Sequence, residues 1–112
     1  MRYVPDRGHL VRLEFSPQAG HERAGRRPAA VLSPRSYNGK VGLLLACPIT
    51  GQRKGYPFEV AIPEGLAVGG VVLADQVRSL DWRARKARYI GALPSDVVEE
   101  LLGKARTLVS PV

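Results

Sequence analysis

Val41-Gly-Leu-Leu-Leu-Ala-Cys47 is an apolar run that no charged or polar side chain interrupts. An unbroken run of this length is typical of a strand buried on both faces, so a central strand is predicted from Leu43 to Cys47. Cys47 ends this run and is expected to be a buried structural thiol rather than a nucleophile. A sheet built around this strand is therefore the first expectation for the fold.

Shorter strands are predicted on both sides of this run. His9 to Phe15 alternates apolar and polar residues, which indicates a half-buried strand. Turn signals lie at Ser33-Pro34, Asn38-Gly39 and Gly69-Gly70, and the last of these suits a tight hairpin. The remaining predicted strands are 28–32, 58–62, 71–80 and 82–90.

The chain ends in a different pattern. From Asp96 to Val109 the apolar residues recur at helical spacing, and Ser95 is in position to cap the helix N-terminus. Five to seven short strands followed by one helix predict a mainly β fold, a small and strongly bent antiparallel barrel. The 112 residues suit one domain spanning residues 1–112.

The charge balance points to an anionic partner. There are 17 Lys and Arg against 10 Asp and Glu, for a net charge of +7, and nucleic acid is the first candidate. A general bias of composition towards Arg is the alternative explanation. The cations gather in two clusters that could follow a phosphate backbone. The clusters are Arg23, Arg26, Arg27, Arg35 and Lys40, and Arg78, Arg83, Arg85, Lys86 and Arg88.

Several classes of chemistry find no support. No Cys or His pair stands at ligand spacing, and the carboxylates do not cluster, so neither a metal nor another cofactor is expected. There is no P-loop, dinucleotide fingerprint or nucleophile elbow. No signal peptide or membrane-spanning run is present, and a single Cys fits the cytoplasm.

Metal-free cleavage of RNA remains, because RNA carries its own nucleophile, the 2′-hydroxyl. A protein need only accept that proton, protonate the leaving oxygen and stabilise the charge on phosphorus. The polar stretch Ser16–Arg27 is expected to be a long loop and offers His21, Glu22, Arg26 and Arg27. By pKa alone His21 would be the first choice of base. The alternative is an ordinary loop of solvated charges.

Several motifs resemble those of the MazF/PemK toxin endoribonucleases, in order and over essentially the whole chain. They are Gly20-His-Glu-Arg-Ala-Gly-Arg-Arg-Pro-Ala-Ala-Val-Leu-Ser-Pro34, Pro48-Ile-Thr50, Lys54-Gly-Tyr-Pro-Phe-Glu-Val60 and Ala74-Asp-Gln-Val-Arg-Ser-Leu80. The resemblance is closest to the chromosomal MazF branch. It implies a small SH3-like barrel with a C-terminal helix, of the MazF/CcdB type.

The resemblance also implies an activity and partners. The activity is sequence-specific, metal-independent cleavage of single-stranded mRNA, with rRNA as a second candidate, to a 2′,3′-cyclic phosphate and a 5′-hydroxyl. The implied partners are a second copy of the chain, a cognate MazE-like antitoxin with a disordered acidic tail, and promoter DNA only through the toxin–antitoxin complex. No membrane partner is expected.

The resemblance carries over to particular residues. The catalytic positions fall on Arg27, Thr50 and Glu22. The residues expected to bind RNA are Arg26, Gln52, Arg53, Lys54, Arg83 and Arg85.

This chain departs from its plasmid-borne relatives at one pair. They place an Arg two residues before the Asp of the Asp-Gln motif, and that pair works as acid and base. Here the position holds Leu73, so the pair cannot be carried over and Asp75 is expected to be structural. His21 matches no catalytic position of the family, and Arg26 stands where some relatives have His.

Two alternatives from other classes stay open. One is a non-catalytic, CcdB-like poison of a protein target, although Leu108-Val-Ser-Pro-Val112 lacks the Trp-Gly-Ile ending of such toxins. The other is an SH3-like RNA-binding module without catalysis, whose binding would weaken with salt.

Overall fold

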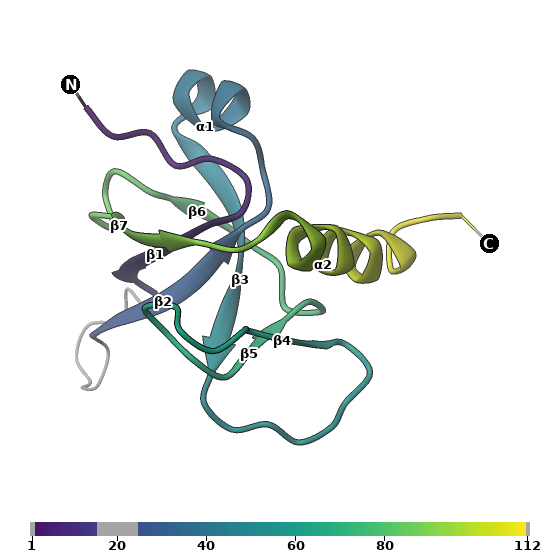
Figure 1. The fold of residues 1–112 in the computed structure, drawn as a ribbon. Coiled ribbons are helices and arrows are strands. Elements are labelled where there is room, and N and C mark those ends of the chain that lie inside the picture. The colour runs from purple at the N-terminus through teal and green to yellow at the C-terminus, as the bar shows by residue number, and fades with distance from the viewer. Residues whose placement is uncertain (1, 16–24, 112) are drawn as a thin grey trace.

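Strand β3, Leu43–Thr50, is the strand around which the sheet is organised. In the computed structural model, which describes residues 2–15 and 25–111, β3 pairs with β2 on one side and with β6 and β5 in succession on the other (Figure 1). This position explains its apolar sequence, because a strand with neighbours on both sides and packing on both faces has little contact with water. The predicted central strand is confirmed, and it extends three residues beyond Cys47.

The described residues form seven strands and two helices. In chain order they are β1 His9–Glu14, β2 Arg26–Val31, α1 Arg35–Val41, β3 Leu43–Thr50, β4 Glu59–Ala61, β5 Val71–Leu73, β6 Arg78–Asp81, β7 Arg88–Ala92 and α2 Ser95–Thr107. All strand pairs are antiparallel. The path β4-β5-β3-β2-β1-β7 bends without closing, since its two ends do not pair among the described residues. The mainly β class with a C-terminal helix is confirmed.

The core consists of two apolar clusters, one on each face of the sheet. Because successive side chains of a strand point to opposite faces, β1 sends Leu10 into the first cluster and Val11 and Leu13 into the second. α2 covers the first cluster with the buried side chains of Val97 and Leu101. No helix in the described part of the chain has the length and apolar character needed to cross a membrane.

Four sequence-based predictions needed correction. β2 begins at Arg26, so Arg26 and Arg27 lie in a strand paired with β1, not in a loop. The turns expected at 33–39 are the short helix α1, held by the buried Asn38. The two strands predicted at 71–80 and 82–90 are instead three shorter strands, β5, β6 and β7, separated by turns. Pro94, not Ser95, is the N-cap of α2.

Asn38 explains why α1 forms where only turns were expected. Its side-chain amide donates hydrogen bonds to the carbonyls of Pro5 and Ser33, and its side-chain oxygen accepts one from the Ser33 hydroxyl. These contacts tie the helix to the N-terminal segment and to the end of β2. Tertiary partners of this kind leave no periodic signal in the sequence.

Candidate active site

The register of β2 and β3 relates Arg27 to Thr50, although the paired residues of the two strands end at Ala29 and Pro48. β2 and β3 pair through Ala29 with Pro48 and through Val31 with Ala46. Continuing this register by two residues brings Arg27 opposite Thr50. Directly opposite residues point to the same face of a sheet, so this extended register assigns the two side chains to one face, two residues beyond the last bonded pair.

The two neighbouring arginines of β2 have different surroundings. Arg26 is half-buried and its guanidinium donates to the carbonyls of Arg12 at 2.8 Å and of Lys86 at 2.6 Å. It therefore ties the start of β2 to β1 and to the β6–β7 turn. Arg27 is exposed. An exposed guanidinium is free to form a bidentate contact with an anionic ligand such as phosphate.

Thr50 is fixed through its backbone. It pairs with Val71 of β5, and Gly70 lies so close to the Thr50 carbonyl that a Cβ at Gly70 would collide with it. The Thr50 hydroxyl accepts the backbone N–H of Gln52 at 3.2 Å. A positive φ of 106° at Gly70 also favours glycine. The Gly69-Gly70 pair, from which the sequence predicted a turn, therefore also allows the close backbone contact that positions Thr50.

Thr50 opens onto a hollow of about 260 Å³ between the β3–β4 loop and the turn after β5. Its wall combines amide, ammonium, carboxylate and aromatic groups, the set needed to distinguish nucleobases. The lining residues are Thr50, Gln52, Lys54, Tyr56, Phe58, Glu59, Leu73, Asp75 and Gln76. Of the residues predicted to bind RNA, Gln52 and Lys54 line this hollow, whereas Arg53 faces a separate hollow beside Gly51.

Glu59 holds the β3–β4 loop in shape and was not singled out from the sequence. Its carboxylate accepts the backbone N–H of Lys54 at 3.0 Å and that of Gly55 at 2.9 Å. Its own carbonyl accepts the ammonium of Lys104 at 2.9 Å, which also pairs with Glu100 at 3.0 Å. The loop is therefore linked to α2. The sequence marked Glu59 only as the polar residue of an alternating strand.

Asp75 and Leu73 lie on the same wall as Thr50. The expectation of a structural Asp75 rested on the loss of the relatives' Arg at Leu73, yet Asp75 is exposed at the hollow. The predictions for Glu22 and His21 fall outside the described residues.

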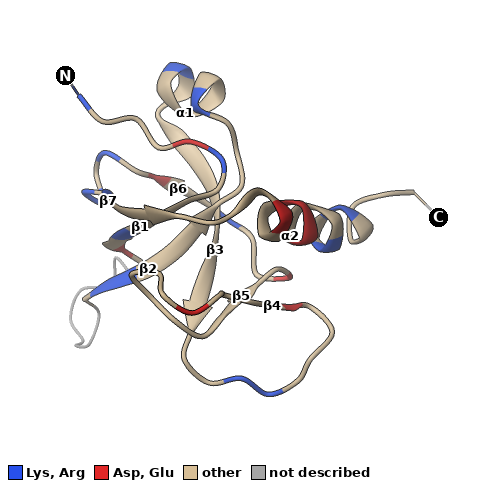
Figure 2. Ribbon diagram, in the orientation of Figure 1, with Lys and Arg blue, Asp and Glu red and all other residues tan. Residues whose placement is uncertain are grey.

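Arg83 and Arg85 lie on the β6–β7 turn, away from the wall of this hollow. Arg83 lies over the Trp82 ring at 4.7 Å from its centroid. Arg85 donates to the carbonyls of Glu14 and Phe15 at 2.9 and 2.8 Å. Arg26 and Arg85 add positive charge where β1 ends and β2 begins, and Figure 2 shows blue segments on β2 and on the turn between β6 and β7.

Other chemistries are not supported by the described residues. They include no group of three or more His, Cys, Asp or Glu side chains that could hold a metal ion. Burial raises the pKa of the Cys47 thiol to about 12, so it is not a ready nucleophile and its predicted structural role is confirmed.

Known proteins resemble this chain over nearly its whole length. Residues 6–109 match the family described as PemK-like, MazF-like toxin of type II toxin-antitoxin system. The Endoribonuclease toxin MazF of Escherichia coli K12 is 48% identical over 108 residues, covering 96% of each chain. Endoribonuclease toxin ChpB of the same strain is 40% identical over 110 residues, covering 93% of each chain. A MazE-MazF crystal structure from Deinococcus radiodurans superposes with a TM-score of 0.91 at 60% identity, covering 96% of this chain and 97% of that one.

Proposed function

The chain belongs to the PemK-like, MazF-like endoribonuclease toxins of type II toxin–antitoxin systems. On that premise we propose that it cuts single-stranded mRNA at a short sequence without a metal ion. The observation that carries this proposal is the hollow lined by Thr50 and by groups that can read bases, on the strand adjacent to the one that carries the exposed Arg27. The catalytic function is favoured over the two non-catalytic alternatives, a CcdB-like poison and an SH3-like RNA-binding module, because the relatives are named endoribonucleases.

The chemistry follows from what these side chains can do. The 2′-hydroxyl attacks the adjacent phosphorus and loses its proton to a base, while the 5′-oxygen leaves with a proton. The products are a 2′,3′-cyclic phosphate and a 5′-hydroxyl. Arg27 donates to the phosphoryl oxygens as negative charge builds up on them, and the Thr50 hydroxyl orients the 2′-hydroxyl or a phosphoryl oxygen. Glu22 is assigned by the resemblance to orient Arg27 or to contact a base edge.

The groups around this pair serve binding. Gln52, Lys54 and the exposed Tyr56 face the hollow and contact the bases, while Arg26, Arg53, Arg83 and Arg85 add positive potential along the path of the backbone. We assign the choice of cleavage sequence to the β3–β4 loop, since it supplies most of the wall.

The central test is Arg27→Ala. Its cleavage of a long single-stranded RNA in the presence of EDTA should fall at least 100-fold, the usual cost of losing a donor to transition-state charge. Mapping the 5′-hydroxyl ends made by the unaltered protein should give one short sequence. Arg2→Ala is the matched control, because Arg2 is an exposed arginine outside both basic clusters, and should cut at the unaltered rate. Equal rates for Arg27→Ala and Arg2→Ala would overturn the mechanism.

The proposal extends to partners. Because complexes named MazE-MazF are among the similar structures, we infer that a cognate MazE-like antitoxin blocks the RNA site of this chain. An acidic antitoxin tail would complement the +7 charge. Promoter DNA is contacted only through that complex. The toxin acts in the cytoplasm, as one domain of residues 1–112 in each half of a homodimer.

A further inference from the structure

A second aromatic and basic hollow lies at the other end of β1. It has a volume of about 490 Å³ and is lined by Tyr3, His9, Arg35, Ala87, Arg88 and Tyr89. None of these residues lines the hollow of Thr50. The volume is in the range of small-ligand sites. His9 and Leu13 lie on the same face of β1, four positions and roughly 13 Å apart. Leu13 pairs with Arg27 of β2, so this spacing estimates how far the second hollow lies from Arg27 along the strand.

Three aromatic rings form the wall of this hollow. The rings of Tyr3 and His9 are nearly parallel, at 14° and 5.8 Å between centroids, and Tyr89 stands edge-on to His9 at 4.9 Å. Tyr89 is 52% exposed although it is a large aromatic side chain. An exposed ring held against two others is a rigid stacking surface, and a base that stacks on it loses little to ordering of the protein.

Hydrogen bonds fix the His9 ring. Its Nδ1 accepts the Tyr3 hydroxyl at 2.9 Å and the backbone N–H of Asp6 at 3.2 Å. Because a backbone N–H can only donate, Nδ1 carries no proton, and the proton of the neutral ring is on Nε2. Burial lowers the pKa of His9 below its usual value. The ring therefore stays neutral at pH 7 and keeps the hollow in one arrangement.

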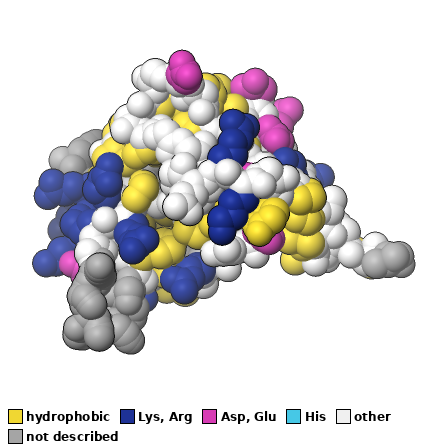
Figure 3. Space-filling view, turned by 90° about the horizontal axis from the view of Figure 1, so that it is seen from below, with side chains coloured by type: hydrophobic (Ala, Val, Ile, Leu, Met, Phe, Trp, Pro, Cys, Tyr) yellow, Lys and Arg dark blue, Asp and Glu magenta, His cyan; other side chains and the backbone are white. Residues whose placement is uncertain are grey.

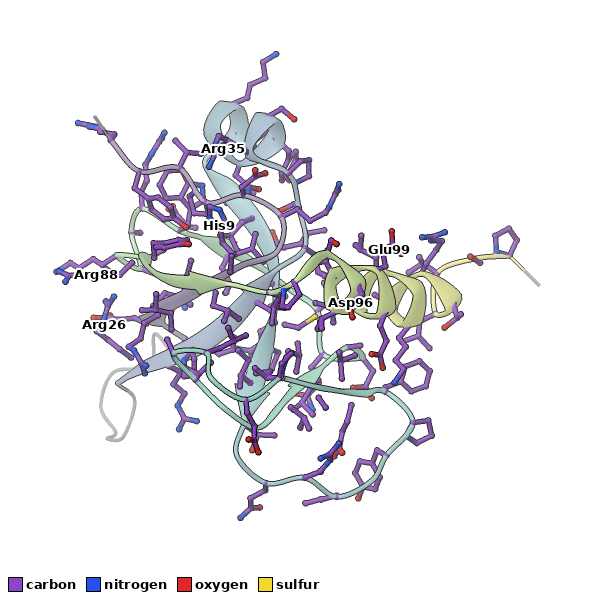
Figure 4. The ribbon with its side chains drawn as sticks, in the orientation of Figure 1. His9, Arg26, Arg35, Arg88, Asp96 and Glu99 are labelled. Atoms are coloured by element: carbon purple, nitrogen blue, oxygen red, sulfur yellow. The ribbon has the colours of Figure 1, made fainter. Side chains whose placement is uncertain are left out.

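Cations frame the hollow and connect it with the active site. Arg35 and Arg88 lie on its rim, and Figure 4 shows Arg88 projecting outward from the edge strand β7. Lys86 follows on the β6–β7 turn, and its carbonyl accepts Arg26, the neighbour of Arg27. A basic edge thus runs from the aromatic hollow to the active site, and Figure 3 shows basic side chains gathered on this flank of the molecule.

We propose that this hollow, formed by Tyr3, His9 and Tyr89 between Arg35 and Arg88, binds a nucleobase of the RNA substrate several nucleotides from the scissile phosphate. The inference rests on the proposed function, because it assumes an RNA substrate. Stacked nucleotides advance about 3.4 Å each, so roughly four of them cover 13 Å. A base that stacks on Tyr89, with its phosphate near Arg88, extends the contact with RNA beyond the sequence read at Thr50.

The test compares RNA affinity at two lengths in the inactive Arg27→Ala protein, in which the RNA stays intact. One RNA holds six nucleotides centred on the mapped cleavage sequence, and the other adds six nucleotides on each side. The longer RNA should bind more tightly than the shorter one. Tyr89→Ala should weaken binding of the longer RNA by roughly 5-fold or more and leave binding of the shorter RNA unchanged. Tyr89→Phe keeps the stacking ring and should retain it. Tyr89 is half exposed, so its truncation should leave the fold intact.

Two outcomes would overturn the proposal. One is an equal gain from the longer RNA with Tyr89→Ala and with Tyr89→Phe. The other is an NMR result in which adenosine or uridine monophosphate shifts the Tyr89 ring resonances and the longer RNA does not. That result would make the hollow a site for free nucleotides. Failure of the proposed function itself would be seen separately, as no RNA cleavage by the unaltered protein.

Discussion

At the scale of single residues, Arg26 and Arg27 are adjacent in the sequence and have opposite surroundings. The guanidinium of Arg26 donates hydrogen bonds to two backbone carbonyls, one on β1 and one on the β6–β7 turn. We predict that Arg26→Ala lowers the free energy of unfolding by about 1 to 2 kcal/mol, since hydrogen bonds to a charged group are lost and two carbonyls lose their donor. Urea denaturation followed by circular dichroism measures the change.

Arg27→Ala is the matched comparison and should change the free energy of unfolding by less than about 0.5 kcal/mol, as exposed substitutions usually do. The opposite order, with Arg27→Ala the more destabilised, would show that the roles of the two side chains are reversed. The resemblance assigned catalysis to Arg27 and RNA binding to Arg26, but the sequence could not show their different surroundings. Both were expected in a loop, and only pairing with β1 reveals that β2 starts at Arg26.

At the scale of elements, the β3–β4 loop depends on one carboxylate for its shape. Glu59 accepts two backbone N–H groups of the loop, and its carbonyl contacts Lys104 of α2. We predict that Glu59→Ala lowers kcat/KM for RNA about tenfold, because Gln52 and Lys54 would no longer be held at the wall beside Thr50. Initial rates on a short RNA with the mapped sequence measure this.

Glu99→Ala removes an exposed carboxylate on α2, outside this wall, and is the control for the change in net charge. If Glu99→Ala reduced kcat/KM as much as Glu59→Ala does, the effect would be one of charge and not of loop shape. Urea denaturation of both variants checks that each remains folded.

Helices and strands whose apolar residues follow a regular pattern could be predicted from the sequence. Elements that depend on contacts with residues far away in the sequence could not. The central strand and the C-terminal helix follow from the apolar run at 43–47 and the helical spacing after Asp96. α1 depends on the contacts of Asn38 with Pro5 and Ser33, which no local pattern encodes. The site divides in the same way. Arg27 and Thr50 came from motifs, but their position opposite each other needs the β2–β3 register, and Glu59 needs the folded loop.

At the scale of the whole molecule, the surface separates a basic flank from an apolar one. The apolar flank is a hollow of about 720 Å³ between α1, β3 and the end of α2, with Tyr37, Leu45, Val77 and Val109 on its wall. These four large side chains are all exposed, Val109 by 81%. Soluble monomers rarely expose apolar residues together in this way. A second copy related by a two-fold axis would cover the patch with the same patch and leave both basic flanks open to RNA.

We therefore predict that Leu45→Glu separates the proposed homodimer into monomers, measured by size-exclusion chromatography with light scattering. A carboxylate placed in an apolar contact would be desolvated when two copies associate, and this cost falls on the dimer and not on the folded monomer. Val41→Glu is the matched control, because Val41 is exposed on α1 outside this hollow, and it should stay dimeric. A dimeric Leu45→Glu protein would assign the contact to another face. If the monomer forms and still cuts RNA at the unaltered rate, each active site is complete within one chain, as the Arg27–Thr50 pair on β2 and β3 already suggests.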